Sequence, residues 1–423
     1  MLAKERIKEI LFEQQTKINA KEFGIERNAL SQIENKIPIP HIVIISGIRR
    51  CGKSTLLRQI IARYFQNQNY YYINFDDERW LGFESQNFNI IYECLIELFG
   101  TANTFFIDEI QNIERFESFV RRFYDDDFKF YLTGSNSDML NSELASKLTG
   151  RYVEISLQPF NFTEYLKLKS ISFDKNTIYN TGERAVIQEN FEKYLILGGM
   201  PEYLKFSDTD ILKQVYDNII TKDIALRFHV SKVFEMRELY QYLITNFSRR
   251  YSYSSLAQNI SLESKITVKE YISFFEITFL GTQIYKFDHS YKKQIANDKK
   301  LYIVDNAFIP LVSNATVKDS GRLLENMVFN ILKNKNQVFY FSDKNECDFI
   351  TQQNNKINGI YQVCYQLNEQ NRKREIAGII QACEMFNFKQ VTILTFEQEE
   401  EIFENNIHIQ VLPVWKWILM CEL

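Results

Sequence analysis

One octapeptide constrains the fold of this 423-residue chain more than any other feature of its sequence. Residues 47–54 read GIRRCGKS and fit the pattern G-x-x-x-x-G-K-[ST] at every fixed position. The apolar segment His41–Ser46, expected to be a strand, precedes them, and a helix expected over Lys53–Phe65 follows. A glycine-rich turn between a strand and a helix is the setting of a phosphate-binding loop. The segment therefore predicts an α/β domain that holds a nucleotide.

The chemistry of this loop predicts ATP and Mg²⁺ as its ligands. Its backbone N–H groups can curl around a phosphate, and the start of the following helix adds a favourable dipole. Lys53 is expected to reach the β- and γ-phosphates, and the Ser54 hydroxyl is expected to ligate Mg²⁺. The predicted nucleotide-binding residues are Gly47, Ile48, Arg49, Arg50, Cys51, Gly52, Lys53, Ser54 and Thr55.

Two further strands carry polar residues at their ends. Residues 104–111 read TFFIDEIQ, an apolar strand that ends in Asp108 and Glu109. Asp108 is expected to hold Mg²⁺, and Glu109 to polarise the attacking water. The strand expected over Phe128–Thr133 should lie between this strand and the one before the loop. Thr133, Ser135 and Asn136 would then lie near the γ-phosphate; Asn136 is the best candidate sensor, and simple turn chemistry is the alternative.

Alternating strand and helix patterns continue to residue 158 and predict a parallel sheet with helices on both faces. Beyond Pro159 the pattern turns mostly helical, and it ends in a second α/β region. The predicted organisation is an N-terminal helical segment (1–37), a P-loop core (38–158), a helical lid (159–247), a winged helix (248–305) and a C-terminal α/β domain (306–423).

Composition excludes several classes of protein. A net charge of −4 and a pI near 5.8 argue against a chain that coats nucleic acid non-specifically. The six cysteines show no C-x-x-C pair and no zinc spacing, which indicates reduced thiols. No run of 18 apolar residues occurs, and the N-terminus has no apolar signal region. We expect a cytoplasmic protein with no membrane contact.

The segment Tyr251–Phe287 has the rhythm of a helix-turn-helix followed by a wing. Basic residues gather around it: Arg249, Arg250, Lys292, Lys293, Lys299 and Lys300. These side chains could bind DNA phosphates, which fix register without reading sequence. The second helix is rich in aromatic residues, so packing against the lid or a neighbouring chain is the alternative. Both interpretations remain open.

Five strings in order carry a family resemblance: IISGIRRCGKSTLL, FFIDEIQNIERFESFVRRFYDDD, LTGSNSDML, LTGRYVEISLQPFNFTEY and YLILGGMPEYL. The chain resembles a large bacterial and archaeal group of AAA-family ATPases, related to the archaeal ATPase and STAND branch near the origin-recognition ATPases. The resemblance implies an AAA-type fold and ATP binding. It also implies that Arg151 acts as an arginine finger or sensor, with a surface ion pair to Asp125–Asp127 as the alternative. Pro201 resembles the lid proline that packs on adenine, with a plain turn as the alternative.

The C-terminal region resembles the core of the PD-(D/E)xK nucleases, of the restriction-endonuclease-like fold. Glu325 on a helix, Asp348 on a strand and Gln362 on the next strand match that pattern. Cys364 stands where the nuclease has a lysine, and a thiol supplies no positive charge. Lys356 or Arg372 could take over that charge. We interpret the domain as a degenerate nuclease fold retained for binding or assembly.

Three functions follow from these patterns. The first is a Mg²⁺-dependent ATPase whose nucleotide state moves the lid and winged helix. The second is an ATP-gated DNA endonuclease. The third is a nucleotide switch without turnover that scaffolds a protein partner or a homo-oligomer.

Overall fold

The computed structural model describes residues 3–20, 22–136, 148, 150–262, 264–313 and 319–422. The chain forms two compact units. The first comprises Met1–Gln158 with Ile277–Phe279, and the second Pro159–Glu276 with Leu280–Leu423.

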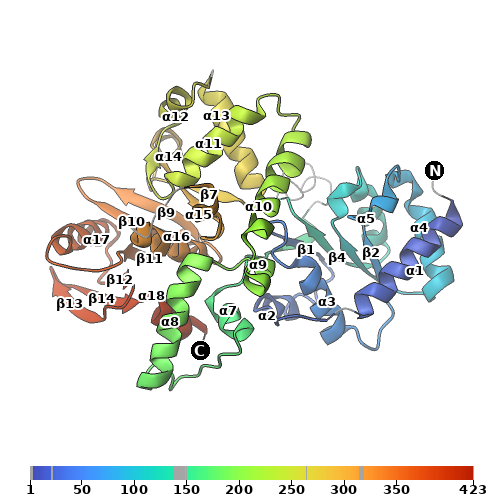
Figure 1. Ribbon diagram of the computed structural model, residues 1–423, viewed down its shortest axis with the longest axis horizontal. Helices are drawn as coiled ribbons and strands as arrows, with labels where there is room; N and C mark the ends of the chain where they lie inside the picture. Colours follow the sequence, from blue (N-terminus) through green and yellow to red (C-terminus); the bar gives the residue numbers. More distant parts are fainter. Residues whose placement is uncertain are drawn as a thin grey trace. The chain divides into compact units, whose positions relative to one another are not determined.

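The first unit is built on a five-stranded parallel sheet in the order β2-β3-β4-β1-β5 (Figure 1). The strands are β1 (Ile42–Ser46), β2 (Tyr71–Asn74), β3 (Thr104–Asp108), β4 (Lys129–Gly134) and β5 (Tyr152–Ser156). β1 and β3 are buried along their whole length, as expected for parallel strands covered on both faces. The predicted parallel sheet is confirmed, and β4 lies between β1 and β3 as predicted.

Helices and aromatic side chains pack around this sheet. The helices are α1 (Lys4–Ala20), α2 (Ala29–Glu34), α3 (Lys53–Tyr64), α4 (Phe88–Phe99) and α5 (Phe116–Asp125). Phe88 on α4 stacks on Phe119 of α5 with ring centroids 4.1 Å apart, and Phe105 of β3 stacks on Phe130 of β4 at 5.1 Å. These rings belong to one buried core that includes residues of β3 and β4.

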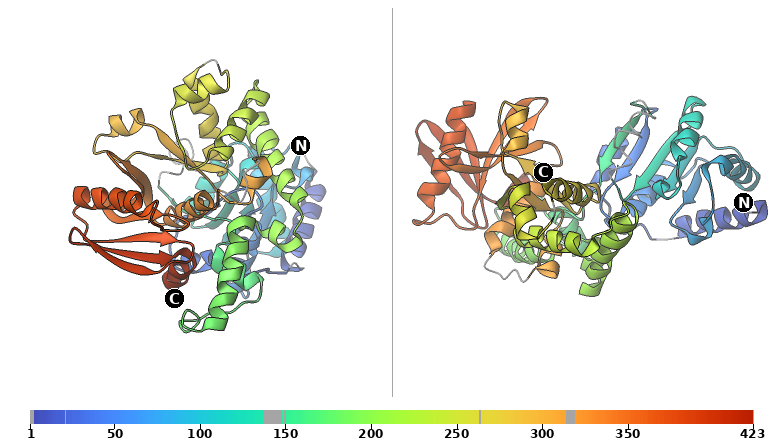
Figure 2. Two further views of the ribbon diagram at one scale, coloured as in Figure 1. Left: turned by 60° about the vertical axis from the view of Figure 1, so that its left-hand side comes forward. Right: turned by 90° about the horizontal axis from the view of Figure 1, so that it is seen from above.

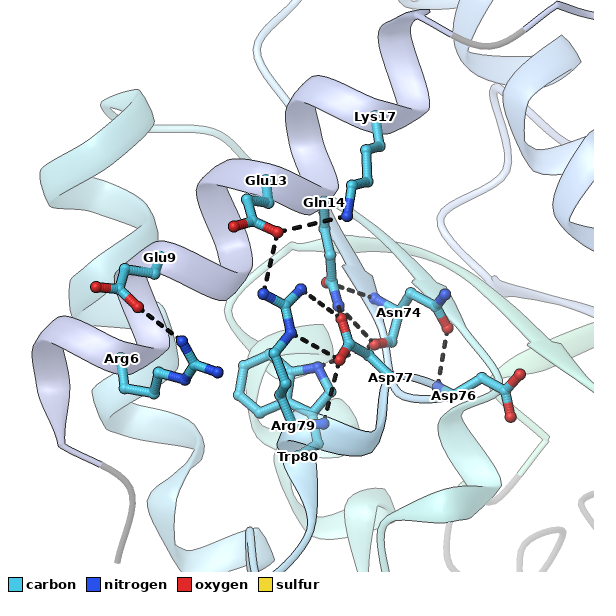
Figure 3. A network of polar contacts seen from close by, with 10 residues as sticks. All are labelled: Arg6, Glu9, Glu13, Gln14, Lys17, Asn74, Asp76, Asp77, Arg79 and Trp80. Atoms are coloured by element: carbon cyan, nitrogen blue, oxygen red, sulfur yellow. Dashed lines mark hydrogen bonds and ion pairs between the residues drawn. The ribbon is translucent and has the colours of Figure 1, made fainter.

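Helix α1 binds the edge strand β2 through glutamine side chains, and Figure 3 shows Gln14 beside Asn74. Gln14 accepts from the backbone N–H of Asn74 and donates to the carbonyl oxygen of the same residue, both at 2.9 Å. Gln15 accepts from the N–H of Tyr72 at 3.1 Å. Arg79 binds Asp77 and Glu13 and so joins the segment after β2 to α1. An edge strand exposes unpaired backbone groups, and α1 satisfies part of them.

The second unit begins with helices. They are α7 (Phe162–Leu168), α8 (Thr181–Leu197), α9 (Pro201–Phe206), α10 (Thr209–Asn218) and α11 (Val233–Thr245), with a π-helical turn over Ile219–Leu226. Polar residues cap the N-terminal ends of two of these helices. Asn161 forms a capping box with Glu164 at α7, and Asp208 caps α10.

The segment predicted to be a winged helix contains two helices and a small sheet. Its elements are β6 (Arg250–Tyr251), α12 (Tyr253–Asn259), α13 (Lys265–Ile277), β7 (Gly281–Tyr285), α14 (Tyr291–Ala296) and β8 (Lys299–Ile303). The three strands are antiparallel in the order β6-β8-β7. The connection between β7 and β8 contains a short helix, α14, which the sequence did not predict.

The C-terminal part of the chain, coloured orange to red in Figure 2, contains a six-stranded mixed sheet. The strand order in this sheet is β13-β14-β12-β11-β10-β9. Its strands are β9 (Gln337–Ser342), β10 (Glu346–Gln353), β11 (Lys356–Val363), β12 (Gln390–Thr395), β13 (Glu400–Glu404) and β14 (Ile407–Pro413). The helices of this region are α15 (Phe308–Val312), α16 (Ser320–Leu332), α17 (Arg372–Phe386) and α18 (Val414–Glu422). Both α16 and α17 pack on β10 and β11. In the described part of the chain, no helix is long and apolar enough to cross a membrane.

Candidate nucleotide site

The loop after β1 is held open by its glycines. Gly47 has a φ of 150°, and a Cβ there would lie 2.2 Å from the carbonyl oxygen of Leu157. The chain that leaves β5 therefore runs directly against the loop, and it pairs with β1 because Leu157 donates to the carbonyl of Ser46 at 2.7 Å. Gly52, with a φ of 104°, precedes the first residue of α3.

Lys53 is buried at the start of α3, with 4% of its surface exposed. Its ammonium group donates to the carbonyl oxygens of Gly47 at 3.1 Å and Ile48 at 3.2 Å. It also lies 3.5 Å from the carboxylate of Glu109. Burial is the largest influence and works against the charge, but the negative charges of Glu109, Cys51 and Asp108 together outweigh it and raise the pKa of Lys53. Lys53 is therefore a cation held inside the loop.

Asp108 ends β3 and faces α3. It accepts from the hydroxyl of Thr133 on β4, from Ser54, and from the phenol of Tyr72 at 3.5 Å. Burial, together with the charge of Glu109, raises the pKa of Asp108. Thr133 also accepts from the backbone N–H of Glu109 at 2.9 Å, so one hydroxyl orients both acids.

Glu109 follows with a left-handed backbone, φ 51°. Its carboxylate accepts from the amide of Gln111, which also donates to Ser135 at 3.3 Å. Burial disfavours its ionisation, but the charge of Lys53 and the Gln111 amide together lower the pKa of Glu109. Ser135 and Asn136 are buried just beyond β4. The structure thus brings Lys53, Ser54, Asp108, Glu109, Thr133 and Ser135 into one connected polar site.

A cavity of about 270 Å³ opens beside the metal candidates Ser54 and Asp108. Residues from α1, α3 and the end of β2 also line it, among them Lys17, Arg58 and Asp76. Helix α1 therefore contributes to the wall of the site as well as to the sheet edge.

Arg27 is a residue of this site that the sequence did not reveal. It is 3% exposed, and its guanidinium donates to the carbonyl oxygens of Cys51 at 2.7 Å and Gln158 at 2.6 Å. Its backbone N–H donates to Gln59 on α3 at 3.1 Å. Arg27 belongs to no motif, and a lone arginine in a charged N-terminal segment carries no signal in the sequence.

Arg151 lies at the other end of the sheet. β5 begins at Tyr152, which pairs with Ile42 at the start of β1, whereas the loop follows Ser46 at the end of β1. The strand separates the two ends by roughly 13 Å. Arg151 forms an ion pair with Asp125 at 3.1 Å and lies over the ring of Tyr124. The structure therefore does not bring Arg151 to the nucleotide site of its own chain.

Pro201 belongs to the second unit and is the first residue of α9. The Gly-Gly pair before it has a packing role there. A Cβ on Gly198 would lie 1.8 Å from Asp305, and Asp305 accepts from the N–H of Gly199 at 2.7 Å and of Ala307 at 2.9 Å. Close approach to Asp305 accounts for the glycines without a nucleotide.

The prediction that the basic side chains around the winged-helix segment are available to DNA phosphates is wrong for two lysines. Lys299 and Lys300 are each only 3% exposed. Lys299 donates to the carbonyl oxygens of Ile295 and Asn297 next to α14. Arg250 pairs with Glu346 at 2.6 Å. Lys299 and Lys300 therefore bind groups of their own chain instead of facing outward, as phosphate contacts would require, whereas the Arg250 side chain stays 48% exposed.

The C-terminal acids do meet, but the expected lack of a cation there is also wrong. Lys300 lies 3.4 Å from Glu325 and 3.6 Å from Asp348, whose backbone N–H donates to Gln362 at 3.2 Å. Arg372 instead pairs with Glu400, at 2.8 Å. A lysine from the preceding hairpin thus supplies the positive charge that Cys364 cannot. Among the described residues, no group of three or more His, Cys, Asp or Glu side chains could hold a metal ion.

Comparisons with known proteins match two parts of the chain to known families. Residues 40–166 match the AAA domain, and residues 188–319 match a domain of unknown function (DUF8612). The chain thus contains an AAA-family P-loop domain. It belongs to the family of the uncharacterized protein MJ1544 of Methanocaldococcus jannaschii, with 32% identity over 97% of this chain and 96% of that protein. An uncharacterized protein of Haemophilus influenzae is 28% identical over 93% of this chain and 98% of its own length.

Several solved structures show a distant similarity to this chain. They include the Aeropyrum pernix Orc1 protein in complex with DNA, with a TM-score of 0.32, 11% identity, and coverage of 74% of this chain and 97% of that one. Another is the Thermotoga maritima RuvB Holliday junction branch migration motor, with a TM-score of 0.26, 16% identity, and coverage of 60% of this chain and 88% of that one.

Proposed function

We propose that this protein binds ATP with Mg²⁺ at the loop between β1 and α3 and hydrolyses it. The observation that carries the proposal is the single connected site formed by Lys53, Ser54, Asp108 and Glu109 at the carboxyl ends of β1 and β3. Ligands of open α/β sheets bind outside the carboxyl ends of the strands.

The residues present suit this substrate and its cation. The N-terminus of α3, preceded by two left-handed glycines, offers backbone N–H groups to phosphate. Lys53 supplies a buried positive charge for the β- and γ-phosphates. Ser54 and Asp108 together form the hydroxyl and carboxylate pair that Mg²⁺ prefers, and Mg²⁺ would neutralise phosphate charge when bound.

Glu109 is the residue we assign to the attacking water. Its carboxylate is anionic because Lys53 and Gln111 stabilise the charge, and an anion is the form that accepts a proton. Thr133 fixes the backbone of Glu109 and the carboxylate of Asp108 at the same time. Asn136 remains our candidate sensor. Arg151 is a candidate finger only toward the site of a second copy, since it lies at the far end of its own sheet.

The test uses the purified protein. Fluorescent-nucleotide titration measures ATP binding, and phosphate release measures turnover. Wild type should bind ATP in a Mg²⁺-dependent manner and turn it over, and Lys53→Ala should lose at least tenfold in affinity while its circular dichroism stays unchanged. Affinity retained within tenfold would contradict the assignment of the loop. Tight ADP binding with negligible hydrolysis would instead favour the switch without turnover.

We infer a second candidate function, contact between DNA and the segment α12–β8, which we interpret as a winged helix. The observation is a set of exposed lysines that form no ion pair with any described residue: Lys265, Lys269, Lys292 and Lys293. Two stand in the first turns of α13 and two on α14. The charge of Lys269 also acts on Lys299, which binds backbone beside α14, so the two helices lie near each other.

Charge reversal separates this candidate from the packing alternative. Changing the four lysines to Glu should reduce the slope of log K against log salt by about 0.9 for each DNA phosphate that a lysine no longer neutralises. Reversal of Lys335 and Lys356, both exposed elsewhere in the second unit, is the matched control and should leave the slope unchanged. Absence of DNA binding by wild type at low salt would assign the segment to packing.

A further inference from the structure

A buried arginine links the nucleotide loop to the point where the chain leaves the first unit. Arg27 donates one bond to the carbonyl of Cys51, inside the loop, and one to the carbonyl of Gln158, the last residue before Pro159. Arg27 is buried, with 3% of its surface exposed. Each carbonyl thus has a charge-assisted partner, a stronger kind of bond than one between neutral groups.

The surroundings of Arg27 keep it in this position. Gln59 on α3 accepts from its backbone N–H and donates to the carbonyls of Phe23 and Ile25, both at 2.7 Å. The segment before Arg27 is therefore fixed to the helix that begins with Lys53. Because one guanidinium binds both carbonyl oxygens, a displacement of the loop at Cys51 would disturb the bond of Arg27 to Gln158 as well.

We propose that Arg27 is a positioning residue for ATP: it sets the shape of the loop and passes a nucleotide-dependent shift of that loop to Gln158. This proposal rests on the ATP function proposed above. The guanidinium of Arg27 donates to backbone carbonyl oxygens at Cys51 and Gln158, so we expect it to act through the shape of the loop.

The experiment compares Arg27→Met and Arg27→Lys with Arg63→Met. Arg63 also lies on the side of α3 that faces the N-terminal segment, but it is exposed and forms an ion pair with Glu26. Arg27→Met should raise the KM for ATP about tenfold or more with a smaller change in kcat, because the hydrogen bonds to Cys51 and Gln158 are lost. Arg27→Lys should recover part of the loss, and Arg63→Met should match wild type.

Hydrogen exchange of residues 159–168 supplies a readout that a purely structural role would not move. ATP should change exchange there in wild type and in Arg63→Met, and saturating ATP should leave it unchanged in Arg27→Met. A response in Arg27→Met equal to that of wild type would overturn the link. Lack of ATP binding by wild type would instead count against the proposed function.

A second inference rests on the C-terminal unit alone. The ammonium group of Lys300 on β8 lies within 3.6 Å of three carboxylates, with 2.7 Å to Glu346, 3.4 Å to Glu325 and 3.6 Å to Asp348. Glu325 belongs to α16, and the other two belong to β10. One buried cation therefore bridges the β7–β8 hairpin, a helix and a strand of the mixed sheet.

Further bonds connect the same elements. Tyr302, also on β8, donates to Glu325 at 2.6 Å, and Tyr340 of β9 donates to the carbonyl of Asp298 at 2.7 Å. The backbone of Phe287 donates to the carbonyl of Tyr340 at 2.8 Å. Burial, together with the charge of Glu325, raises the pKa of Asp348 to about 8.

We propose that Lys300 is the resident cation of this acidic cluster: it locks the β7–β8 hairpin to the mixed sheet and takes the position between Glu325 and Asp348 that a divalent metal would need. The hairpin and the sheet then move as one body. The cluster is a structural lock and not a metal site.

Lys300→Met should speed hydrogen exchange in β8 and β10 at least tenfold, because breaking a buried ion pair leaves charges uncompensated. Lys292→Met, an exposed lysine of the same hairpin, is the control and should behave as wild type. Adding Glu325→Gln and Asp348→Asn to Lys300→Met should recover most of the protection, since the surplus charge is then removed.

Two outcomes would contradict this role of Lys300. One is hydrogen exchange in Lys300→Met equal to that of wild type, which would show that the cation does not stabilise the contact between the hairpin and the sheet. The other is an increase in wild-type protection of β10 on addition of MnCl₂ without nucleotide, lost in Asp348→Asn, which would show a metal site.

Discussion

The ammonium group of Lys53 lies 3.5 Å from the carboxylate of Glu109, and only 3% and 17% of the two side chains are exposed. In the proposed reaction the first group binds phosphate and the second activates water. Because the γ-phosphate is also an anion, it must compete with Glu109 for the same ammonium group. Phosphate binding would therefore release Glu109 from Lys53 and leave its carboxylate available to the attacking water.

Replacing Glu109 with Gln should separate turnover from binding. The amide keeps the size of the side chain but cannot accept a proton, so turnover should fall about 10²-fold or more. Affinity for ATP should be retained or rise, because a competitor for Lys53 loses its charge. Phosphate release under single-turnover conditions measures the first effect, and fluorescent-nucleotide titration measures the second. Normal hydrolysis by this variant would assign the base to another acid.

Asp108→Asn should give the opposite pattern. A neutral amide in place of the carboxylate weakens a Mg²⁺ ligand, so the Mg²⁺-dependent part of ATP affinity should fall while binding in EDTA stays the same. Titrations of wild type and variant with and without Mg²⁺ measure this difference. Equal loss in both conditions would indicate that Asp108 has only a structural role.

Thr133 should matter through its hydroxyl and not through its shape. Thr133→Val keeps the size of the side chain but removes the donor to Asp108 and the acceptor for the N–H of Glu109. Unpaired buried groups cost about 1–3 kcal/mol each, and turnover should fall about tenfold as the two acids lose their orientation. Thr133→Ser retains the hydroxyl and should stay close to wild type. Equal activity of the Val and Ser variants would refute this role.

The features that could be predicted from the sequence are those that depend on a local pattern of residues. The strand before Gly47, the helix at Lys53 and the acids at the end of β3 are contiguous strings, and their order along the chain implies the position of β4 in the sheet. The unpredicted residues act across long separations. Arg27 binds Gln158, and Gln14 binds Asn74. The periodicity of apolar residues does not predict such contacts, because each contact depends on the packing of elements that are distant in sequence.

The basic cluster shows a second limit. Lys299 and Lys300 follow Asp298 in a polar stretch, and their charge predicts exposure. The structure buries both, since carbonyl oxygens beside α14 bind one and carboxylates from α16 and β10 bind the other. A buried lysine becomes predictable only once its acidic partners are located in space. The same contacts explain why Cys364 is tolerated at a position where a lysine was expected.

Stability should depend on pH through Asp305. Burial raises the pKa of Asp305 to about 7, although the N–H groups of Ala307 and Gly199 oppose the shift. The unfolded chain ionises this group near pH 4, so between about pH 4 and about pH 7 the folded state binds the extra proton. Its contribution to stability is therefore complete below pH 4 and declines as pH rises toward 7.

Asp305→Asn tests this contribution. The slope of the unfolding free energy against pH should become less negative by about 1.4 kcal/mol per pH unit within that window. Urea unfolding of the two proteins across the window measures the slopes. Asp210→Asn, at an exposed acid of α10, is the control and should leave the slope as in wild type. Parallel curves for wild type and Asp305→Asn would show that Asp305 is ionised throughout.

Finally, the C-terminal acids should not cleave DNA. An in-line attack on a phosphodiester needs a metal ion beside the acids, a positive charge at the phosphate, and access for the substrate. Lys300 supplies a charge, but it is 3% exposed and Asp348 is 7% exposed, so a phosphodiester cannot reach either group. The thiol of Cys364 does not help, because burial raises its pKa to about 12 and keeps it neutral. Supercoiled plasmid incubated with the protein, ATP and Mg²⁺ or Mn²⁺ should remain supercoiled, and Cys364→Lys should not change that. Nicking that disappears in Asp348→Ala but persists in the exposed control Asp343→Ala would show instead that the cluster opens to DNA.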